Sequence, residues 1–89
     1  MKSLNLPPFE YKVKKQNGQV WIFDSIRKRY VVLTPEEWVR QHFIHFLIDR
    51  KGYSARLIAV EKEIQVCGMK RRFDIVCYDR QATPYLIVE

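Results

Sequence analysis

The sequence predicts an α+β fold with an N-terminal β-meander, one helix and then a three-stranded antiparallel sheet. The helix is indicated by TPEEWVRQHFIHFLIDRKG, residues 34–52, which opens with a threonine and a proline and closes at a glycine. On both sides of it, short runs alternate apolar and polar residues with the period of two that is typical of strands. The apolar fraction of 47% favours a folded chain, and 89 residues suffice for one domain or a fragment of one.

Residues 9–33 are predicted to form the β-meander. FEYKVKKQNGQVWIFD contains Asn17-Gly18, a pair suited to a two-residue turn in which both residues have positive φ. If Gln16 pairs with Gln19 across this turn, Val13 faces Ile22. RKRYVVL, residues 27–33, then supplies the third strand.

The helix has recognisable signals at both ends. Thr34 is the expected N-cap and Pro35 the first helical residue, with cations and a glycine at the C-terminal end. Counting 100° per residue predicts an apolar face that consists of Val39, Phe43, Phe46 and Leu47. Glu36 falls on that same face, whereas Glu37 is expected to point away from it and to serve the cap.

The three C-terminal strands are predicted at residues 57–66, 71–78 and 85–89. With Val66 opposite Arg71 and Tyr78 opposite Tyr85, apolar side chains gather on one face and charged ones on the other. Ile75 and Val88 fall on the apolar face.

In this register Asp74 lies between Glu89 on one neighbouring strand and Glu63 on the other. Like charges that face each other destabilise a sheet, so these carboxylates need a counter-charge. A hard cation such as Mg²⁺ would supply it, and Glu36 could be aimed at the same cluster. Two plainer interpretations stay open: Arg72 and nearby lysines neutralise the sheet acids, and the helix dipole stabilises Glu36.

The charge balance favours an anionic partner. Sixteen Lys and Arg against ten Asp and Glu give a net charge of +6 and a pI near 9.6, which makes nucleic acid the leading candidate; a soluble domain that merely carries excess lysine is the alternative. Lys70, Arg71 and Arg72 are the candidate DNA-binding residues because they precede Asp74. A solvated charge run is the alternative. Three further residues, Trp21, Phe23 and Tyr30, could stack on bases or pack in a core.

Other features argue against several classes of site. Cys67 and Cys77 have no metal-type spacing and are expected to be reduced thiols. His42 and His45 lack partners at zinc-site spacing and are expected to be structural or solvent-facing. The sequence contains no secretory signal and no apolar run of about 18 residues, so we expect a cytoplasmic protein that does not span a membrane.

A helix that opens with an acid, followed by strands with Asp74 on the second and Glu89 closing the third, resembles the PD-(D/E)XK nuclease superfamily. More narrowly, the chain from about Phe9 looks like the N-terminal nuclease region of type I restriction enzyme R subunits. The segments that carry this resemblance are TPEEWVRQHFIHFLI, LIAVEKEI, RRFDIVCYD and PYLIVE. It implies that Asp74 and Glu89 are catalytic and bind Mg²⁺, that Glu36 is a further metal ligand, and that residues 34–89 form a partial restriction-endonuclease-like core.

One departure from the family pattern concerns activity. The signature continues as E-x-K, whereas the sequence ends at Glu89, so we expect a fragment that lacks the catalytic lysine and is inactive by itself. The resemblance also implies DNA and other restriction-modification subunits as partners, and self-association through the C-terminal edge strand is expected. The alternative function is a non-catalytic nucleic-acid- or protein-binding module on the same fold.

Overall fold

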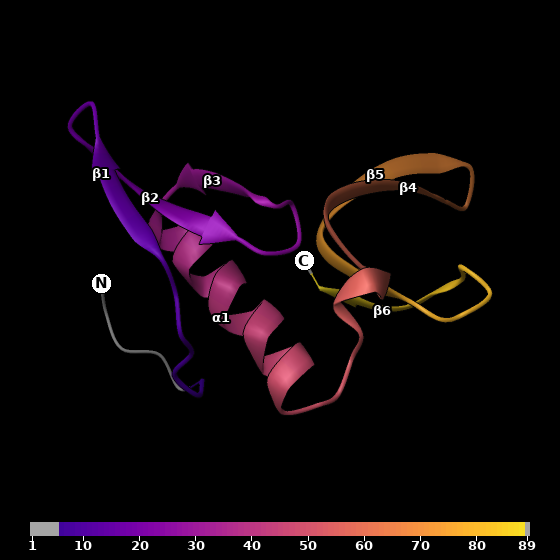
Figure 1. Cartoon of the computed structure of the whole chain (residues 1–89). Helices are drawn as coiled ribbons and strands as arrows, with labels where there is room; N and C mark the ends of the chain where they lie inside the picture. The colour runs from indigo at the N-terminus through magenta and orange to yellow at the C-terminus, as the bar shows by residue number, and fades with distance from the viewer. Residues whose placement is uncertain (1–5, 89) are drawn as a thin grey trace. The chain divides into compact units, whose positions relative to one another are not determined.

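The computed structural model describes residues 6–88 and contains two antiparallel three-stranded sheets and one α-helix (Figure 1), which confirms the α+β class. The chain divides into two compact units, residues 1–52 and 53–89. The helix therefore belongs to the same unit as the meander. Within residues 6–88, no helix is long and apolar enough to cross a membrane.

The first unit is the meander with its helix. Strands β1 (Val13–Gln16), β2 (Gln19–Asp24) and β3 (Arg29–Val32) pair in the order β1-β2-β3, and helix α1 (Pro35–Asp49) follows. Val13 pairs with Ile22 and Gln16 with Gln19, as predicted. Asn17 and Gly18 both have positive φ, 53° and 75°, because a two-residue turn must match the twist of its strands.

The N-terminus of α1 is capped as predicted, but its buried face differs from the prediction. Thr34 accepts a hydrogen bond from the backbone N–H of Glu37 at 3.1 Å, and Pro35 is the first helical residue. The buried side chains are those of Glu37, Gln41, His42, Ile44 and Leu47, whereas Val39 is 46% exposed. The expectation that Glu37 points away was wrong, because cationic and amide side chains surround its carboxylate in the interior.

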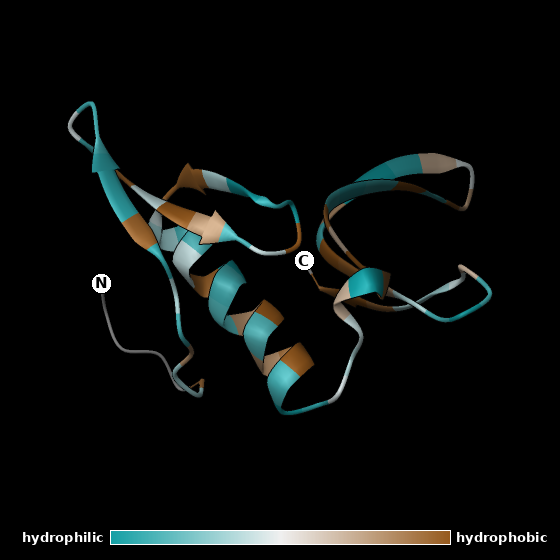
Figure 2. Ribbon diagram, in the orientation of Figure 1, coloured by the Kyte–Doolittle hydropathy of each residue, from teal (hydrophilic) through white to brown (hydrophobic). Residues whose placement is uncertain are grey.

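Figure 1 shows the meander lying along one side of α1. Ile22 and Asp24 lie on the same face of β2 and are fully buried. Figure 2 shows hydrophilic and hydrophobic bands in alternation along α1, so hydropathy alone does not single out one buried face. Asp24 is neutralised locally, since Arg27 forms an ion pair with its Oδ2.

The second unit is a sheet with a short lead-in. A 3-10 turn, η1 (Ala55–Leu57), precedes strands β4 (Ile58–Val66), β5 (Met69–Tyr78) and β6 (Pro84–Val88), which pair in the order β4-β5-β6. The core residues Ile58, Phe73, Ile75 and Cys77 share one face, as the period of two predicted. Val76 is the exception, since it is fully buried on the other face.

The β4–β5 register differs from the prediction by two residues. Val66 pairs with Met69 and not with Arg71, because the turn holds only Cys67 and Gly68. Both have positive φ, 51° and 78°, as in the Asn17-Gly18 turn. A shift of two keeps every side chain on its predicted face but changes its partner.

The β5–β6 register agrees with the prediction over most of its length. Ile75 pairs with Val88 and Cys77 with Leu86, which confirms that Ile75 and Val88 share a face. Tyr78 pairs with Pro84 and not with Tyr85, because the register shifts after Cys77. Glu89 lies outside the described residues.

Replacing Cys67 by asparagine is expected to stabilise the protein by about 0.5–1 kcal/mol, because asparagine tolerates left-handed φ better than cysteine does. Urea denaturation followed by circular dichroism measures the change. The matched control is Asn17→Cys in the other two-residue turn. This variant should be destabilised by a similar free energy. A decrease in stability for Cys67→Asn would contradict this account of the turn.

Candidate functional site

Asp74 lies on the exposed, charged face of the second sheet. It sits in β5 between Phe73 and Ile75, both of which are buried on the opposite face. Strand alternation therefore turns the Asp74 carboxylate to solvent, as predicted, while its neighbours fix the strand by packing. An exposed carboxylate on a backbone held by a packed face is accessible to a cation or a substrate.

The residue across from Asp74 on β4 is Glu61. Val60 pairs with Ile75 and Lys62 pairs with Phe73, which leaves Glu61 and Asp74 opposite each other between these two pairs. Glu61 has φ of 52°, an unusual conformation for a residue other than glycine. Such strain costs on the order of 1–3 kcal/mol and is concentrated at functional sites.

Glu63, the predicted neighbour of Asp74, pairs with Arg72 instead. This correction follows from the two-residue turn, which moves each β4 partner by two positions. Sequence reasoning missed Glu61 for the same reason. The signal that could have found it is the resemblance of Cys67-Gly68 to Asn17-Gly18, since both are an X-Gly pair between alternating runs.

The three candidate DNA-binding cations do not lie on one face of the sheet. Lys70 and Arg72 share the face of Asp74, whereas Arg71 lies on the other face, its guanidinium 5.4 Å from the centre of the Phe73 ring. Arg72 Nη2 is 3.1 Å from Glu61 Oε2, and Lys70 Nζ is 4.0 Å from Glu63 Oε1. Exposed pairs of this kind contribute little to stability, so both cations can exchange partners with an incoming anion.

The other predicted metal ligands are distributed over the chain. Glu36 is exposed in the first turn of α1, so it lies in the first unit while Asp74 lies in the second. Its role as a ligand stays a prediction, as does that of Glu89. Within residues 6–88, no three His, Cys, Asp or Glu side chains come together to hold a metal ion.

The histidines of α1 are packing residues, as expected. The Phe9 ring stacks on His45 with 4.3 Å between ring centres and meets His42 edge-on at 4.7 Å. His42 Nδ1 is 3.0 Å from the Trp38 carbonyl oxygen. Burial lowers the pKa of His45, although Asp49 acts in the opposite direction. Both cysteines are free thiols, and burial raises the pKa of Cys77.

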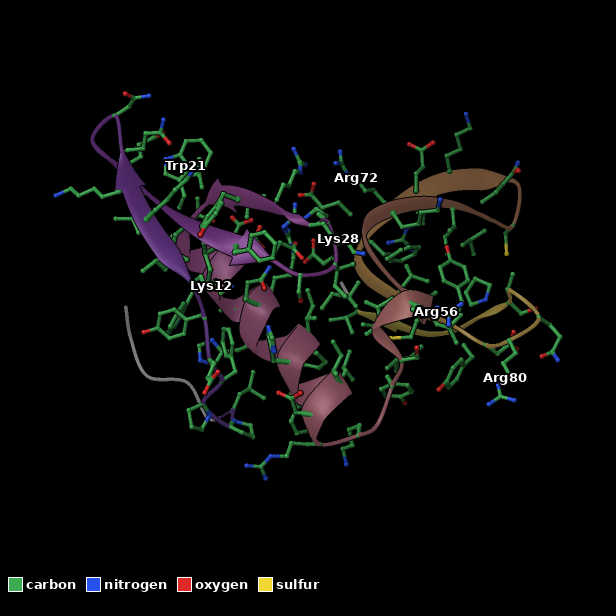
Figure 3. The ribbon with its side chains drawn as sticks, in the orientation of Figure 1. Lys12, Trp21, Lys28, Arg56, Arg72 and Arg80 are labelled. Atoms are coloured by element: carbon green, nitrogen blue, oxygen red, sulfur yellow. The ribbon has the colours of Figure 1, made fainter. Side chains whose placement is uncertain are left out.

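A pocket of about 400 Å³ lies in the second unit, lined by Ser54, Arg56, Leu57 and Arg80. Figure 3 shows Arg56 on the 3-10 turn and Arg80 on the loop before β6. The nearest acid in sequence, Asp79, is committed to that loop, since its Oδ1 accepts hydrogen bonds from the backbone N–H of Gln81 and Thr83, both at 2.9 Å. Two guanidinium groups at one pocket suit a phosphate.

Nothing in the sequence indicated this pocket. Its two arginines are isolated in the sequence, outside any basic run, and only the fold brings them to a common pocket.

The geometry defines a small α+β protein with a charged, exposed sheet face, and comparison with known proteins gives its family. The family model described as the type I restriction enzyme R protein N terminus matches residues 35–89. Because this match covers more than half of the chain, the chain belongs to that family. The match begins at Pro35 and not near Phe9, so the meander lies outside it. No curated protein and no solved structure gave a significant match.

Proposed function

We propose that this chain contributes metal-binding carboxylates to a nuclease of the PD-(D/E)XK type, which hydrolyses phosphodiester bonds of DNA with the help of Mg²⁺. The observation that carries the proposal is the placement of Asp74. It is an exposed carboxylate in the middle of β5, opposite a second acid with an unusual φ, inside the segment that matches the restriction-enzyme family.

The carboxylate of Asp74 is the kind of ligand that Mg²⁺ prefers, which supports the proposed ion. Mg²⁺ takes oxygen ligands and is usually held by one or two carboxylates, with waters and substrate phosphate completing its shell. The second proposed ligand is Glu89, which lies outside the described residues and stays a prediction. Bound by these carboxylates, the ion would polarise the scissile phosphate and lower the pKa of an attacking water.

The chain's own cations would hold the DNA. Lys70 and Arg72 precede Asp74 on the same face of β5, and Arg56 and Arg80 line a pocket in the same unit, so four cations of this unit are candidates for contacts with DNA phosphates. The net charge of +6 favours binding that is independent of base sequence and weakens as salt rises. DNA and the other subunits of a restriction-modification system are the proposed partners.

A binding module without catalysis is the second candidate. The observation in its favour is the ion pair between Arg72 and Glu61, which already supplies a counter-charge beside Asp74. A sheet face neutralised in this way has no need of a metal ion.

Removal of the metal separates the two candidates. We expect the protein, as its gene encodes it, to relax supercoiled plasmid in the presence of Mg²⁺ and to leave it intact in EDTA. A parallel preparation of Asp74→Ala controls for contaminating nucleases. If the protein retards the plasmid in a gel equally with Mg²⁺ and with EDTA but never nicks it, the binding module is the correct function.

A further inference from the structure

The outer face of the meander carries a cluster of aromatic rings. Ile22 and Asp24 occupy the buried face of β2, so Trp21 and Phe23 lie on the opposite, outer face. Phe23 pairs with Tyr30 on β3, which adds a third ring to that face. Figure 3 shows Trp21 on the side of the meander away from α1.

These three rings are not a core. Trp21, Phe23 and Tyr30 are each only half-buried, whereas Ile22 between the first two is fully buried. Sequence reasoning left open whether they stack on bases or pack inside, and the alternation of β2 places them on the outer side.

Local contacts hold the rings in place. Phe23 and Tyr30 meet edge-to-face with 5.3 Å between ring centres, and Trp21 Nε1 donates a hydrogen bond to the Gln16 carbonyl oxygen at 3.3 Å. Lys14 Nζ lies 4.4 Å from the centre of the Tyr30 ring. Rings fixed before a ligand arrives lose less conformational entropy on binding.

The charge on this face has one sign. Lys14 pairs with Trp21, and the Phe23 N–H donates to the Lys12 carbonyl oxygen at 2.9 Å, so Lys12 and Lys14 lie beside the rings. The paired positions of this face contain no acid; they are Lys12, Lys14, Gln16, Gln19, Trp21, Phe23, Tyr30 and Val32. This face therefore combines aromatic surfaces with positive charge.

We propose that this outer face of β1–β3 binds single-stranded DNA. Bases would stack on Trp21 and on the Phe23–Tyr30 pair, and Lys12 and Lys14 would contact backbone phosphates. Trp21 and Phe23 are two residues apart on one strand, about 7 Å. This is roughly twice the 3.4 Å rise per nucleotide of a stacked strand, so the two platforms seat bases that are pulled apart. Duplex DNA cannot use them, because its bases are paired and stacked.

This site is independent of the proposed nuclease. It lies in the first unit, outside the residues that match the restriction-enzyme family, and no step of cleavage involves it. Loss of nicking in Asp74→Ala and loss of single-strand binding in a platform variant are therefore separate results.

The test is fluorescence anisotropy with a labelled oligo-dT strand and with a duplex of the same length, at low salt. We expect the protein to bind the single strand more tightly than the duplex. Trp21→Ala should lower the affinity for the single strand about ten- to hundredfold. Trp21→Phe keeps a ring and should retain most of the affinity. Circular dichroism establishes that each variant is folded.

A pair of adjacent lysines provides the matched control. Lys14 lies on the outer face, whereas Lys15 pairs with Val20 on the other face, and both are exposed. Lys14→Ala should lower the affinity for the single strand and reduce its salt dependence by the equivalent of about one phosphate contact. Lys15→Ala should lower this affinity less. Equal losses for the two lysines, a folded Trp21→Ala that binds like the wild type, or tighter binding of duplex would each overturn the proposal.

Discussion

Glu37→Ala is expected to destabilise the first unit by about 3–5 kcal/mol, because it removes a buried carboxylate that two partly buried cations share. Glu37 is only 5% exposed, and its carboxylate accepts hydrogen bonds from Arg27 Nη2 at 2.8 Å and Arg40 Nη1 at 2.6 Å. Gln41 Nε2 donates to it as well, at 2.9 Å. A loss of this size is a large fraction of the 5–15 kcal/mol that stabilises a typical domain.

The direction of the Arg27 pKa shift agrees with this network. Burial lowers its pKa, but hydrogen bonds to Glu37 and Asp24 outweigh that effect and raise it. The charged guanidinium is thus stabilised in the folded state through its acids. Removing Glu37 takes away the carboxylate that Arg27 Nη2 and Arg40 Nη1 both contact.

Glu36→Ala is the matched control, one position away. Glu36 is exposed, and the helix dipole stabilises an acid at that position by only a few tenths of a kcal/mol. The free energy of unfolding of the Glu36→Ala variant should therefore differ from that of the wild type by less than about 0.5 kcal/mol. The alanine in Glu37→Ala keeps the backbone N–H that donates a hydrogen bond to the Thr34 hydroxyl, so loss of the helix cap does not explain a difference in stability between the two variants. Urea denaturation followed by circular dichroism measures both, and equal losses would show that the carboxylate network is not stabilising.

Asp74→Ala is expected to reduce Mg²⁺-dependent nicking at least about a thousandfold. A metal ligand is worth several kcal/mol of transition-state stabilisation, and each 1.4 kcal/mol corresponds to about tenfold in rate. The Asp74 side chain is exposed, so the variant should keep its fold and its affinity for DNA. Plasmid relaxation rates, together with gel retardation, separate loss of cleavage from loss of binding.

Glu61 and Glu63 provide an internal comparison for this experiment. Each forms an exposed ion pair with a cation of β5, but only Glu61 lies opposite Asp74. Glu61→Gln should lower the nicking rate about ten- to hundredfold as a neighbour of the metal ligand, while Glu63→Gln should leave it unchanged. If Glu63→Gln is as damaging as Glu61→Gln, the effect is general electrostatics, and Glu61 has no special role.

Local signals in the sequence predicted the order of elements and both ends of the helix. Thr34 and Pro35 specify the N-terminus of α1 through a hydrogen bond and a fixed φ, which involve only neighbouring residues. Asn17-Gly18 specified the first hairpin and its register, because few residues tolerate positive φ. Alternation along β5 placed Asp74 on the face opposite Ile75 without knowledge of any partner strand.

Tertiary structure decided which side chains contact one another. Which acid of α1 is buried was decided by Arg27, a loop residue ten positions before Glu37, whose guanidinium stabilises a carboxylate that would otherwise favour water. The neighbour of Asp74 was decided by the two-residue turn at Cys67, which moves each β4 partner by two positions. Arg56 and Arg80 share a pocket only because the sheet returns the chain to that point. Backbone conformation depends on adjacent residues, and the sequence determines it directly. Counter-charges and cross-strand neighbours come from distant residues, and only the folded chain brings them together.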